Sequence, residues 1–427
     1  MGVDFFKKAG WLRFNFPLVF SEPPDLIPGM SMKVERIIDS RRITAEGGHY
    51  FFAYYDKLQF SPDDRFALAQ RAMFDDRPPR PDDVLEVGMI DLLDDNRWIP
   101  LGTTTAWCWQ QGCMLQWLPG HDDLILFNTR EDGHYGSVIV DMRGVVQKRL
   151  PRAVYTVRPD GLEAISSDFA RTGHTRPGYG YVGIPDPNME RPAPGDSGLW
   201  RMNLETGENE MIFSIADLAS NDPVPAMRTE LNWFNHILYN TDGSRIVFLH
   251  RWQTPRQTRM YTCRPDGSDL YRVSDAGDPC GWQASHFWWR DAKTIMVWGG
   301  SLSDQVTSGY RLVTDRTGEE LIINPDLLNQ DGHMSYPPGE SGWFVSDTYP
   351  DRKTNMRLLF FCNESGGPQI VVARHDAGRF NATEPSLVEC RCDFHPRWNR
   401  AGTRITIDSV HEGYRGVYLL DVENVFP

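Results

Sequence analysis

Short apolar runs alternate with turn residues along the chain, and one phrase recurs. An apolar or aromatic run is followed by a Pro, Asp or Gly turn and then by a run rich in β-branched and aromatic residues, which is typical of a β-hairpin. Clear copies occupy Leu58–Arg71, Leu115–Arg130, Ile237–Arg251, Phe287–Gly299, Met334–Tyr349 and Phe394–Val410, and a degenerate copy occupies Tyr155–Asp168. The copies begin roughly 40 to 80 residues apart, near the period of a propeller blade.

These units predict an all-β fold, a seven-bladed β-propeller built from four-stranded antiparallel blades. Helical periodicity is weak throughout, and Ile215–Ser220 is the one helical candidate. No Ser/Gly linker or charge run divides the chain, so residues 1–427 are expected to form a single domain. Its first residues, about 45 of them, are expected to be an extension or a ring-closing segment. A β-sandwich, or two stacked β-domains, is the alternative architecture.

Charge and hydropathy narrow the range of partners. The formal net charge is −14, so no nucleic-acid partner is expected, because phosphate binding needs a basic face. No uninterrupted apolar stretch is long enough to span a membrane. The chain is expected to be cytoplasmic, or periplasmic or secreted if a leader has been removed. The pattern gives no oligomeric state.

Histidines recur at one register of the repeat. When the phrases are aligned on their turns, His236, His286, His333 and His395 fall just before the first strand of four successive units. The first strand of each blade lines the central channel of a propeller, so these side chains are expected to ring one mouth. The second strand of each hairpin returns to the same mouth and ends in a further set of polar residues that includes Arg130, Arg251, Tyr349 and His411. Converging polar groups in a walled cavity predict a binding or catalytic site.

Thiols and an imidazole are concentrated ahead of the last unit. Cys390, Cys392 and His395 fit on one side of an extended strand that is kinked before Pro396. Together with His286 from an earlier blade they are the expected metal ligands, and mixed Cys/His ligands favour zinc. The alternative is a pair of reduced, buried cysteines.

The residues of the C-terminal half also resemble a known family. Asn235–Tyr261, Ser285–Trp289 and Cys392–Val422 resemble the oligogalacturonate lyases, and ulvan lyases share this kind of propeller. The N-terminal half matches loosely, through Gln110–Pro119. The resemblance implies a seven-bladed propeller that cleaves uronic-acid glycans by β-elimination, with an acidic oligosaccharide as its substrate.

The resemblance also implies roles for individual residues. It makes His236 the base, and it places a divalent metal on His286 and on a group that reads Cys390, Asp393 and His395 in this chain. Cysteine stands where the family has glutamine, which favours zinc over manganese or calcium and leaves galacturonate itself open as the substrate.

β-Elimination needs a group that neutralises the uronate carboxylate, a base, and an acid for the leaving oxygen. The expected catalytic residues are His236, Tyr239, Arg251, His174 and Tyr179. The expected substrate-binding residues are Arg130, Arg176, Tyr181, His333, Tyr349 and His411. His174, Arg176, Tyr179 and Tyr181 lie in a Gly/Pro-rich segment that is expected to cover the mouth.

Two other functions fit parts of the same pattern. A non-catalytic propeller that acts as a binding platform would need a polar ring without metal. A glycoside hydrolase would need two carboxylates facing each other across the substrate, for which Asp347, Asp408 and Glu412 are the candidates.

Overall fold

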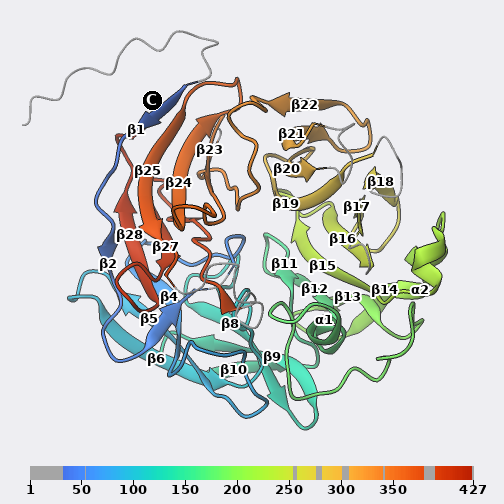
Figure 1. Ribbon diagram of the computed structural model, residues 1–427. Helices are drawn as coiled ribbons and strands as arrows, with labels where there is room; N and C mark the ends of the chain where they lie inside the picture. The colour runs from blue at the N-terminus through green and yellow to red at the C-terminus, as the bar shows by residue number, and fades with distance from the viewer. Residues whose placement is uncertain are drawn as a thin grey trace, which may run out of the picture.

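Seven four-stranded sheets are arranged around a central axis (Figure 1). The computed structural model describes residues 32–52, 54–252, 257–275, 281–300, 307–339, 342–378 and 390–425. The predicted seven-bladed β-propeller is therefore confirmed. Within the described ranges the α-helices are α1 (Phe169–Thr175) and α2 (Ile215–Ser220), and neither is long and apolar enough to cross a membrane. The helix predicted at Ile215–Ser220 is thus confirmed.

Blades 1 to 5 each follow the chain from the inner strand outward. Blade 1 contains β3 (His49–Phe51), β4 (Phe66–Ala72), β5 (Leu85–Asp91) and β6 (Arg97–Thr104). Blade 2 contains β7 (Gln116–Trp117), β8 (Leu124–Glu131), β9 (His134–Asp141) and β10 (Val146–Leu150). Blade 3 contains β11 (Thr156–Val157), β12 (Glu163–Ser167), β13 (Gly198–Asn203) and β14 (Asn209–Ser214).

The remaining blades complete the ring. Blade 4 contains β15 (Asn232–Tyr239), β16 (Ile246–Trp252), β17 (Gln257–Cys263) and β18 (Tyr271–Asp275). Blade 5 contains β19 (Gln283–Trp289), β20 (Thr294–Gly300), β21 (Gly309–Thr314) and β22 (Glu320–Ile323). Blade 6 is built from β23 (Trp343–Asp347), β24 (Met356–Asn363), β25 (Gln369–Asp376) and β1 (Lys33–Glu35), and blade 7 from β26 (Arg397–Trp398), β27 (Arg404–Ser409), β28 (Gly416–Asp421) and β2 (Arg41–Arg42).

The beginning of the described chain supplies the outermost strand of both final blades. β1 pairs with β25, with Lys33 opposite Gln369, and β2 pairs with β28, with Arg41 opposite Leu419. The β1–β25 pair is parallel, whereas the sequence predicted antiparallel blades throughout. β2, in contrast, runs antiparallel to its neighbour β28. These pairings join the two ends of the ring.

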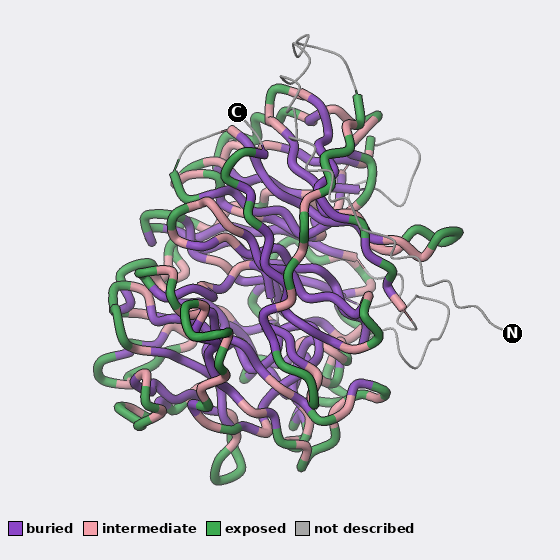
Figure 2. Tube along the Cα trace, turned by 90° about the vertical axis from the view of Figure 1, so that its left-hand side faces the viewer, coloured by how far each residue is buried: buried purple, intermediate pink, exposed green. Residues whose placement is uncertain are grey.

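Apolar side chains between the blades form the core. Strand interiors are buried, while the hairpin tips and connections are exposed (Figure 2). One cluster holds Trp107 and Trp117, and another holds Trp289, so these tryptophans serve packing between blades. Trp288 differs because it is partly buried and its ring centroid lies 6.1 Å from that of Tyr55 on the axis.

Candidate active site

Four buried histidines lie together on the axis and are called here the central histidine group: His236, His286, His333 and His395. They are 2–4 % exposed. The ring centroids are 5.5 Å apart for His236 and His286, 4.2 Å for His286 and His333, and 4.3 Å for His333 and His395. The structure therefore brings together the histidines that shared one register of the repeat.

Local backbone irregularities accompany these side chains. The pairing of β15 with β16 shifts register between Asn235 and Leu238, and that of β19 with β20 shifts between Ala284 and Phe287. Such bulges re-aim side chains next to functional sites. His236 and His395 also adopt positive φ angles, 50° and 46°, which are unfavourable for a residue with a Cβ atom. Strain of this kind concentrates at binding and catalytic sites.

Carboxylates behind the group fix two of the imidazole rings. His286 Nδ1 lies 2.9 Å from Asp331, and His333 Nδ1 lies 2.9 Å from Asp347. Each carboxylate accepts a hydrogen bond from the Nδ1–H of its histidine, so each neutral ring keeps a lone pair on Nε2. Burial lowers the pKa of His236, of His286 and of His395, and the charge of Arg251 lowers that of His236 further. Those three imidazoles are neutral at neutral pH and can accept a proton or a metal ion.

Part of the group can hold a cation. Ligand atoms of His333, Asp393 and His395 all lie within 4.8 Å of one another, and all three residues are buried. Within the described residues, Nε2 of His333 and Nε2 of His395 are buried without a hydrogen-bond partner. Leaving a buried polar atom unpaired lowers the stability of the fold by about 1–3 kcal/mol. Coordination of a cation by these two nitrogens would remove that cost. The donor set of imidazole nitrogen and carboxylate oxygen suits a divalent transition metal.

Asp393 carries a negative charge at this position. Its carboxylate accepts hydrogen bonds from Arg357 and, at 2.8 Å, from Arg391 Nε. Burial raises the pKa of Asp393, but the two guanidinium groups outweigh burial and hold that pKa well below its usual value. A metal bound here would compete with these arginines for the carboxylate.

The two cysteines expected as ligands lie elsewhere. Cys390 and Cys392 are buried in the apolar cluster that contains Trp107 and Trp109. Burial raises the pKa of Cys392 to about 12, so its thiol is not ionised. Side chains alternate in direction along this extended segment, which sends Cys390 and Cys392 into the core and Asp393 and His395 toward the axis. The expectation that the cysteines and His395 share one side is therefore corrected.

Two tyrosines that follow β3 in the sequence, Tyr54 and Tyr55, lie among the histidines. The Tyr54 hydroxyl lies 2.7 Å from His236 Nδ1, and the Tyr55 hydroxyl donates a hydrogen bond of 2.8 Å to the carbonyl oxygen of Phe287. The Tyr54 ring centroid is 5.0 Å from that of His395. Burial raises the pKa of both phenols, so both stay protonated. The repeat does not indicate these two residues, because they follow β3 and lie outside the strands of blade 1.

A second layer of aromatic and cationic groups lies beside the histidines. The Tyr179 hydroxyl accepts a hydrogen bond of 2.9 Å from Arg391, and its ring centroid lies 6.0 Å from that of His236. Arg176 lies over the Tyr179 ring at 4.8 Å. Tyr349 lies 6.0 Å from His333 by ring centroids, with Arg391 at 5.3 Å from its centroid. The structure thus places three of the expected residues near the central histidine group: Arg176, Tyr179 and Tyr349. It adds Arg391, which the sequence did not indicate.

Two tyrosines expected at the mouth bond elsewhere. Tyr239 donates a hydrogen bond of 2.8 Å to Glu163, because β15 carries it to the opposite end of the strand from Asn232. Tyr181 accepts a hydrogen bond of 2.8 Å from Asn128 and stacks on Phe169 at 4.3 Å. Neither hydroxyl reaches the central histidine group, so their expected catalytic and binding roles are corrected.

Three further expected residues also lie away from the axis. His174 is exposed on α1, whose buried side packs inward. Arg130 lies at the rim, with Nη2 3.4 Å from the fully exposed Asp82. His411 stacks on His375 with 3.7 Å between ring centroids, at the outer part of blades 6 and 7.

The carboxylates that a glycoside hydrolase would use are already engaged. Asp347 accepts hydrogen bonds from His333, and Asp408 accepts one of 2.7 Å from Arg397 and is nearly fully buried. Glu412 pairs with Arg42 at the surface. These three groups therefore do not form a facing pair across one substrate site.

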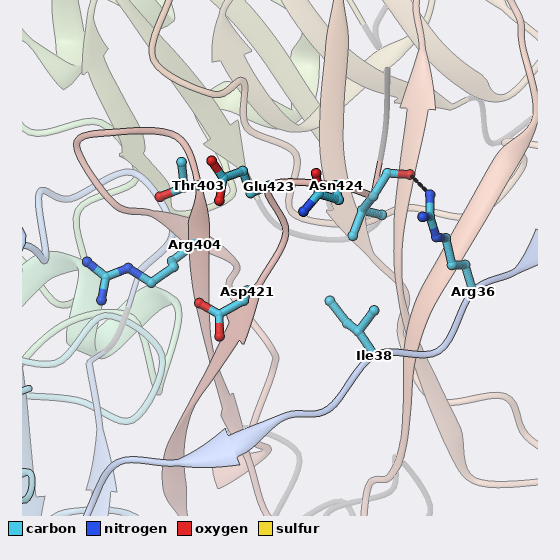
Figure 3. A pocket seen from close by; sticks show the side chains of 8 residues that line it. Arg36, Ile38, Thr403, Arg404, Asp421, Glu423 and Asn424 are labelled. Atoms are coloured by element: carbon cyan, nitrogen blue, oxygen red, sulfur yellow. Dashed lines mark hydrogen bonds between the residues drawn. The ribbon is translucent and has the colours of Figure 1, made fainter. Parts of the chain in front are cut away.

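A separate cavity of about 540 Å³ lies where the ring closes (Figure 3). Arg36 and Ile38 of the β1–β2 connection form one wall, and Thr403, Arg404, Asp421 and Glu423 lie opposite, at blade 7. Arg36 spans the gap with a hydrogen bond of 2.8 Å to the carbonyl oxygen of Val425. None of the central histidines lines this cavity, so it belongs to the closure and not to the candidate site.

Solved structures share the whole propeller. An oligogalacturonate lyase in complex with manganese matches with a TM-score of 0.63 and 17 % sequence identity, over 92 % of this chain and 98 % of that one. An oligogalacturonate lyase from Vibrio parahaemolyticus matches with a TM-score of 0.63 and 14 % identity, over 91 % and 95 % of the two chains. A xyloglucanase from Xanthomonas campestris matches less well, with a TM-score of 0.50 and 14 % identity, over 91 % of this chain and 54 % of that chain. No protein-family model and no curated protein matches.

The fold and the axial site define a seven-bladed β-propeller with a histidine-rich centre. Among propellers, the chain is similar over nearly its whole length to the oligogalacturonate lyases. At such low identities the likeness establishes the shared fold, and the chemistry has to be argued from this chain's own residues.

Proposed function

We propose that the protein is a polysaccharide lyase that cleaves uronic-acid-containing oligosaccharides by β-elimination. The observation that carries the proposal is the Tyr54–His236 pair, in which a protonated phenol lies 2.7 Å from a neutral imidazole beside Arg251. One group that can take a proton thus touches one that can give a proton. The whole-chain likeness to oligogalacturonate lyases supports the same class of reaction.

The proposed reaction uses three kinds of side chain: a histidine as base, a tyrosine as acid, and arginines that neutralise the carboxylate. A neutral His236 takes the proton from C5 of the uronate, the electron pair left behind forms the C4=C5 double bond, and the C4–O bond breaks. Tyr54 or Tyr179 gives its phenolic proton to the leaving oxygen. Arg251 and Arg391 neutralise the uronate carboxylate, which makes the C5 proton easier to remove.

A divalent cation fits the same site. His333 and His395 would hold it through Nε2, with Asp393 and His286 as neighbouring donors. When bound, it would supply additional positive charge next to the uronate carboxylate. Because the cysteines are in the core, the sequence argument for zinc loses its basis. The proposal therefore specifies a divalent transition metal held by imidazole and carboxylate, with manganese and zinc as the two ions to compare.

The test is ultraviolet absorbance during incubation with uronate oligosaccharides. The conjugated unsaturated uronate that a lyase releases absorbs ultraviolet light, whereas the saturated products of hydrolysis lack this absorbance. Galacturonan, ulvan and rhamnose–glucuronate fragments would each be tested with and without chelator. A rise that His236→Ala abolishes would support the lyase, and a rise that chelator abolishes would support the metal. Uptake of water without unsaturation would instead indicate a hydrolase, and binding without any cleavage would indicate a binding platform.

A further inference from the structure

A groove of about 540 Å³ lies between blades 2 and 3, outside the central site. It is lined on one side by the β8–β9 hairpin and the connection from β10 to β11, and on the other by the start of α1 and by β13. Its walls carry Tyr135, Phe169, Pro185, Pro187 and Trp200. Flat apolar rings and prolines of this kind suit the apolar face of a pyranose ring or another small ligand.

An arginine without a carboxylate partner lines this groove. The guanidinium of Arg152 lies over the Trp200 ring, 3.3 Å from its centroid, and Nε donates a hydrogen bond of 2.6 Å to Asn209. Both contacts hold the guanidinium in one orientation. Among the residues that the structure describes, no carboxylate forms an ion pair with Arg152, and its two terminal nitrogens have no hydrogen-bond acceptor.

The Arg152 guanidinium is half-buried. Burial lowers the pKa of Arg152, which shows that water solvates the guanidinium only partly. Two carboxylates, Asp168 and Asp196, also line the groove. The Asp168 carboxylate accepts a hydrogen bond from the backbone N–H of Arg171 at the start of α1, and Asp196 pairs with Arg191, so neither forms an ion pair with Arg152. A carboxylate matches the planar fork of terminal N–H groups that Arg152 leaves unused.

The groove opens on the same face as the central site. Arg251 lies near the end of β16, the second strand of blade 4, and approaches His236 from that end. The ends of β8 and β12, the equivalent strands of blades 2 and 3, lead directly into the groove. Helix α1 links the two places along the chain, since Phe169 at its start lines the groove and Tyr179 follows shortly after its end. A helix of this length spans about 10 Å, a distance that an oligosaccharide can bridge.

We propose that this groove is a distal subsite for a carboxylate-bearing sugar, in which Arg152 binds the uronate carboxylate and the aromatic wall contacts the ring. The proposal rests on the proposed function for its substrate class. The uronate in the groove would belong to the same acidic oligosaccharide as the unit cleaved at the axis, so longer chains would bind more tightly than short ones.

Binding is tested first, without catalysis. Galacturonate, glucuronate and the neutral sugar galactose are titrated into the protein while tryptophan fluorescence and saturation-transfer NMR are recorded. We expect a uronate to bind and Arg152→Ala to weaken that binding at least tenfold, while galactose gives no Arg152-dependent signal. Arg149→Ala is the matched control, because Arg149 is exposed on the neighbouring strand, pairs with Glu131 and does not line the groove. Equal uronate binding by the Arg152→Ala variant and the unaltered protein would overturn the proposal.

Chain length provides the second measurement. If the lyase reaction is observed, Arg152→Ala should raise the KM for long oligosaccharides about tenfold more than for the shortest one cleaved, since a charge-assisted hydrogen bond contributes that order of affinity. Equal effects at all lengths would overturn the distal subsite and leave the lyase standing. If no uronate is cleaved but Arg152-dependent uronate binding persists, in the His236→Ala variant as well, the subsite stands and the proposed function fails.

Discussion

Two histidine clusters in this molecule differ in what their ring nitrogens contact. The peripheral histidine pair, His375 and His411, stacks between blades 6 and 7. His375 is satisfied on both sides, with Nδ1 2.9 Å from Ser409 and Nε2 3.0 Å from Ser40. In the central histidine group, Nε2 of His333 and Nε2 of His395 have no partner among the described residues.

The difference shows which property marks a site. Burial lowers the pKa of His375 and of His395 alike, so a low pKa does not separate them. Unpaired nitrogens, carboxylates on the opposite ring atoms and positive φ angles occur together only in the central group, within the residues that the structure describes. The peripheral pair has a structural role, because the hydrogen bond between His375 and Ser40 attaches the β1–β2 connection to blade 6.

Replacement of the base should produce the largest effect. His236→Ala should lower kcat by about 10³-fold or more, because general base catalysis contributes about 10²–10⁴. His411→Gln changes the peripheral pair and should leave kcat within a few fold. Both variants would be assayed by unsaturated-product formation, with circular dichroism to verify folding. A large loss of kcat in His411→Gln alone would reverse the assignment of the two clusters.

Removal of a metal donor should come next. His395→Gln should weaken binding of manganese or zinc about 10–100-fold or more, since even supporting groups at metal sites contribute that much. Cys392→Ala is the control, because its thiol is buried in the apolar cluster and the variant should keep its metal. Elemental analysis and calorimetric titration with each ion measure the effect. Loss of metal in Cys392→Ala with retention in His395→Gln would restore the cysteine ligands that the sequence suggested.

The hydroxyl beside the base should have a smaller effect. Tyr54→Phe removes the proton donor but keeps the position of the ring. The variant should therefore lower kcat about 10–100-fold with little change in KM. Tyr181→Phe removes an equally buried hydroxyl that bonds Asn128, and it should cost about 1 kcal/mol of stability with kcat nearly unchanged. Equal kcat values for both variants would show that Tyr54 only packs.

Acid should weaken the fold through the imidazoles that are fully paired or deeply buried. Burial lowers the pKa of His375, and that of His250, to about 3, from an ordinary value of 6.5. The unfolded chain therefore takes up protons below pH 6.5 that the folded chain refuses until about pH 3. Each residue contributes stability that is present above pH 6.5 and declines by up to about 1.4 kcal/mol per pH unit below it.

Thermal unfolding at a series of pH values measures this decline. His375→Gln should flatten the slope between pH 6.5 and pH 3, whereas His121→Gln, which alters an exposed histidine, should not. A slope that is the same in both variants would mean that other groups govern the acid response.

The repeat made the architecture and the central ring predictable. Turn signals at blade intervals gave the seven sheets, and one shared register gave His236, His286, His333 and His395. Residues at equal positions in equivalent blades must converge on the axis, so no knowledge of side-chain contacts was needed. Arg176, Tyr179 and Tyr349 were also placed near the axis by their positions in loops and at strand ends.

The misplaced residues depended on details that the repeat does not carry. Cys390 and Cys392 differ from His395 by an odd number of positions, and the alternation of an extended chain separated them from it. Tyr239 follows His236 by three positions, but both lie on β15, and an extended strand carries Tyr239 away from His236 toward Glu163. Tyr54 lies in a segment that leaves the blade pattern, so the pattern could not indicate it.

The short strands β1 and β2 have a consequence for the order in which the molecule is completed. Their partners, β25 and β28, are synthesised nearly the whole chain length later. Blades 1 to 5 can therefore form while β1 and β2 are still unpaired. The propeller ring closes only after the strands of blade 7 have been synthesised. Contacts between such distant segments form late and slowly. The seam between blades 6 and 7 is accordingly where unfolding should begin, and breaks in the covalent chain elsewhere on the ring should be tolerated better than loss of these few residues.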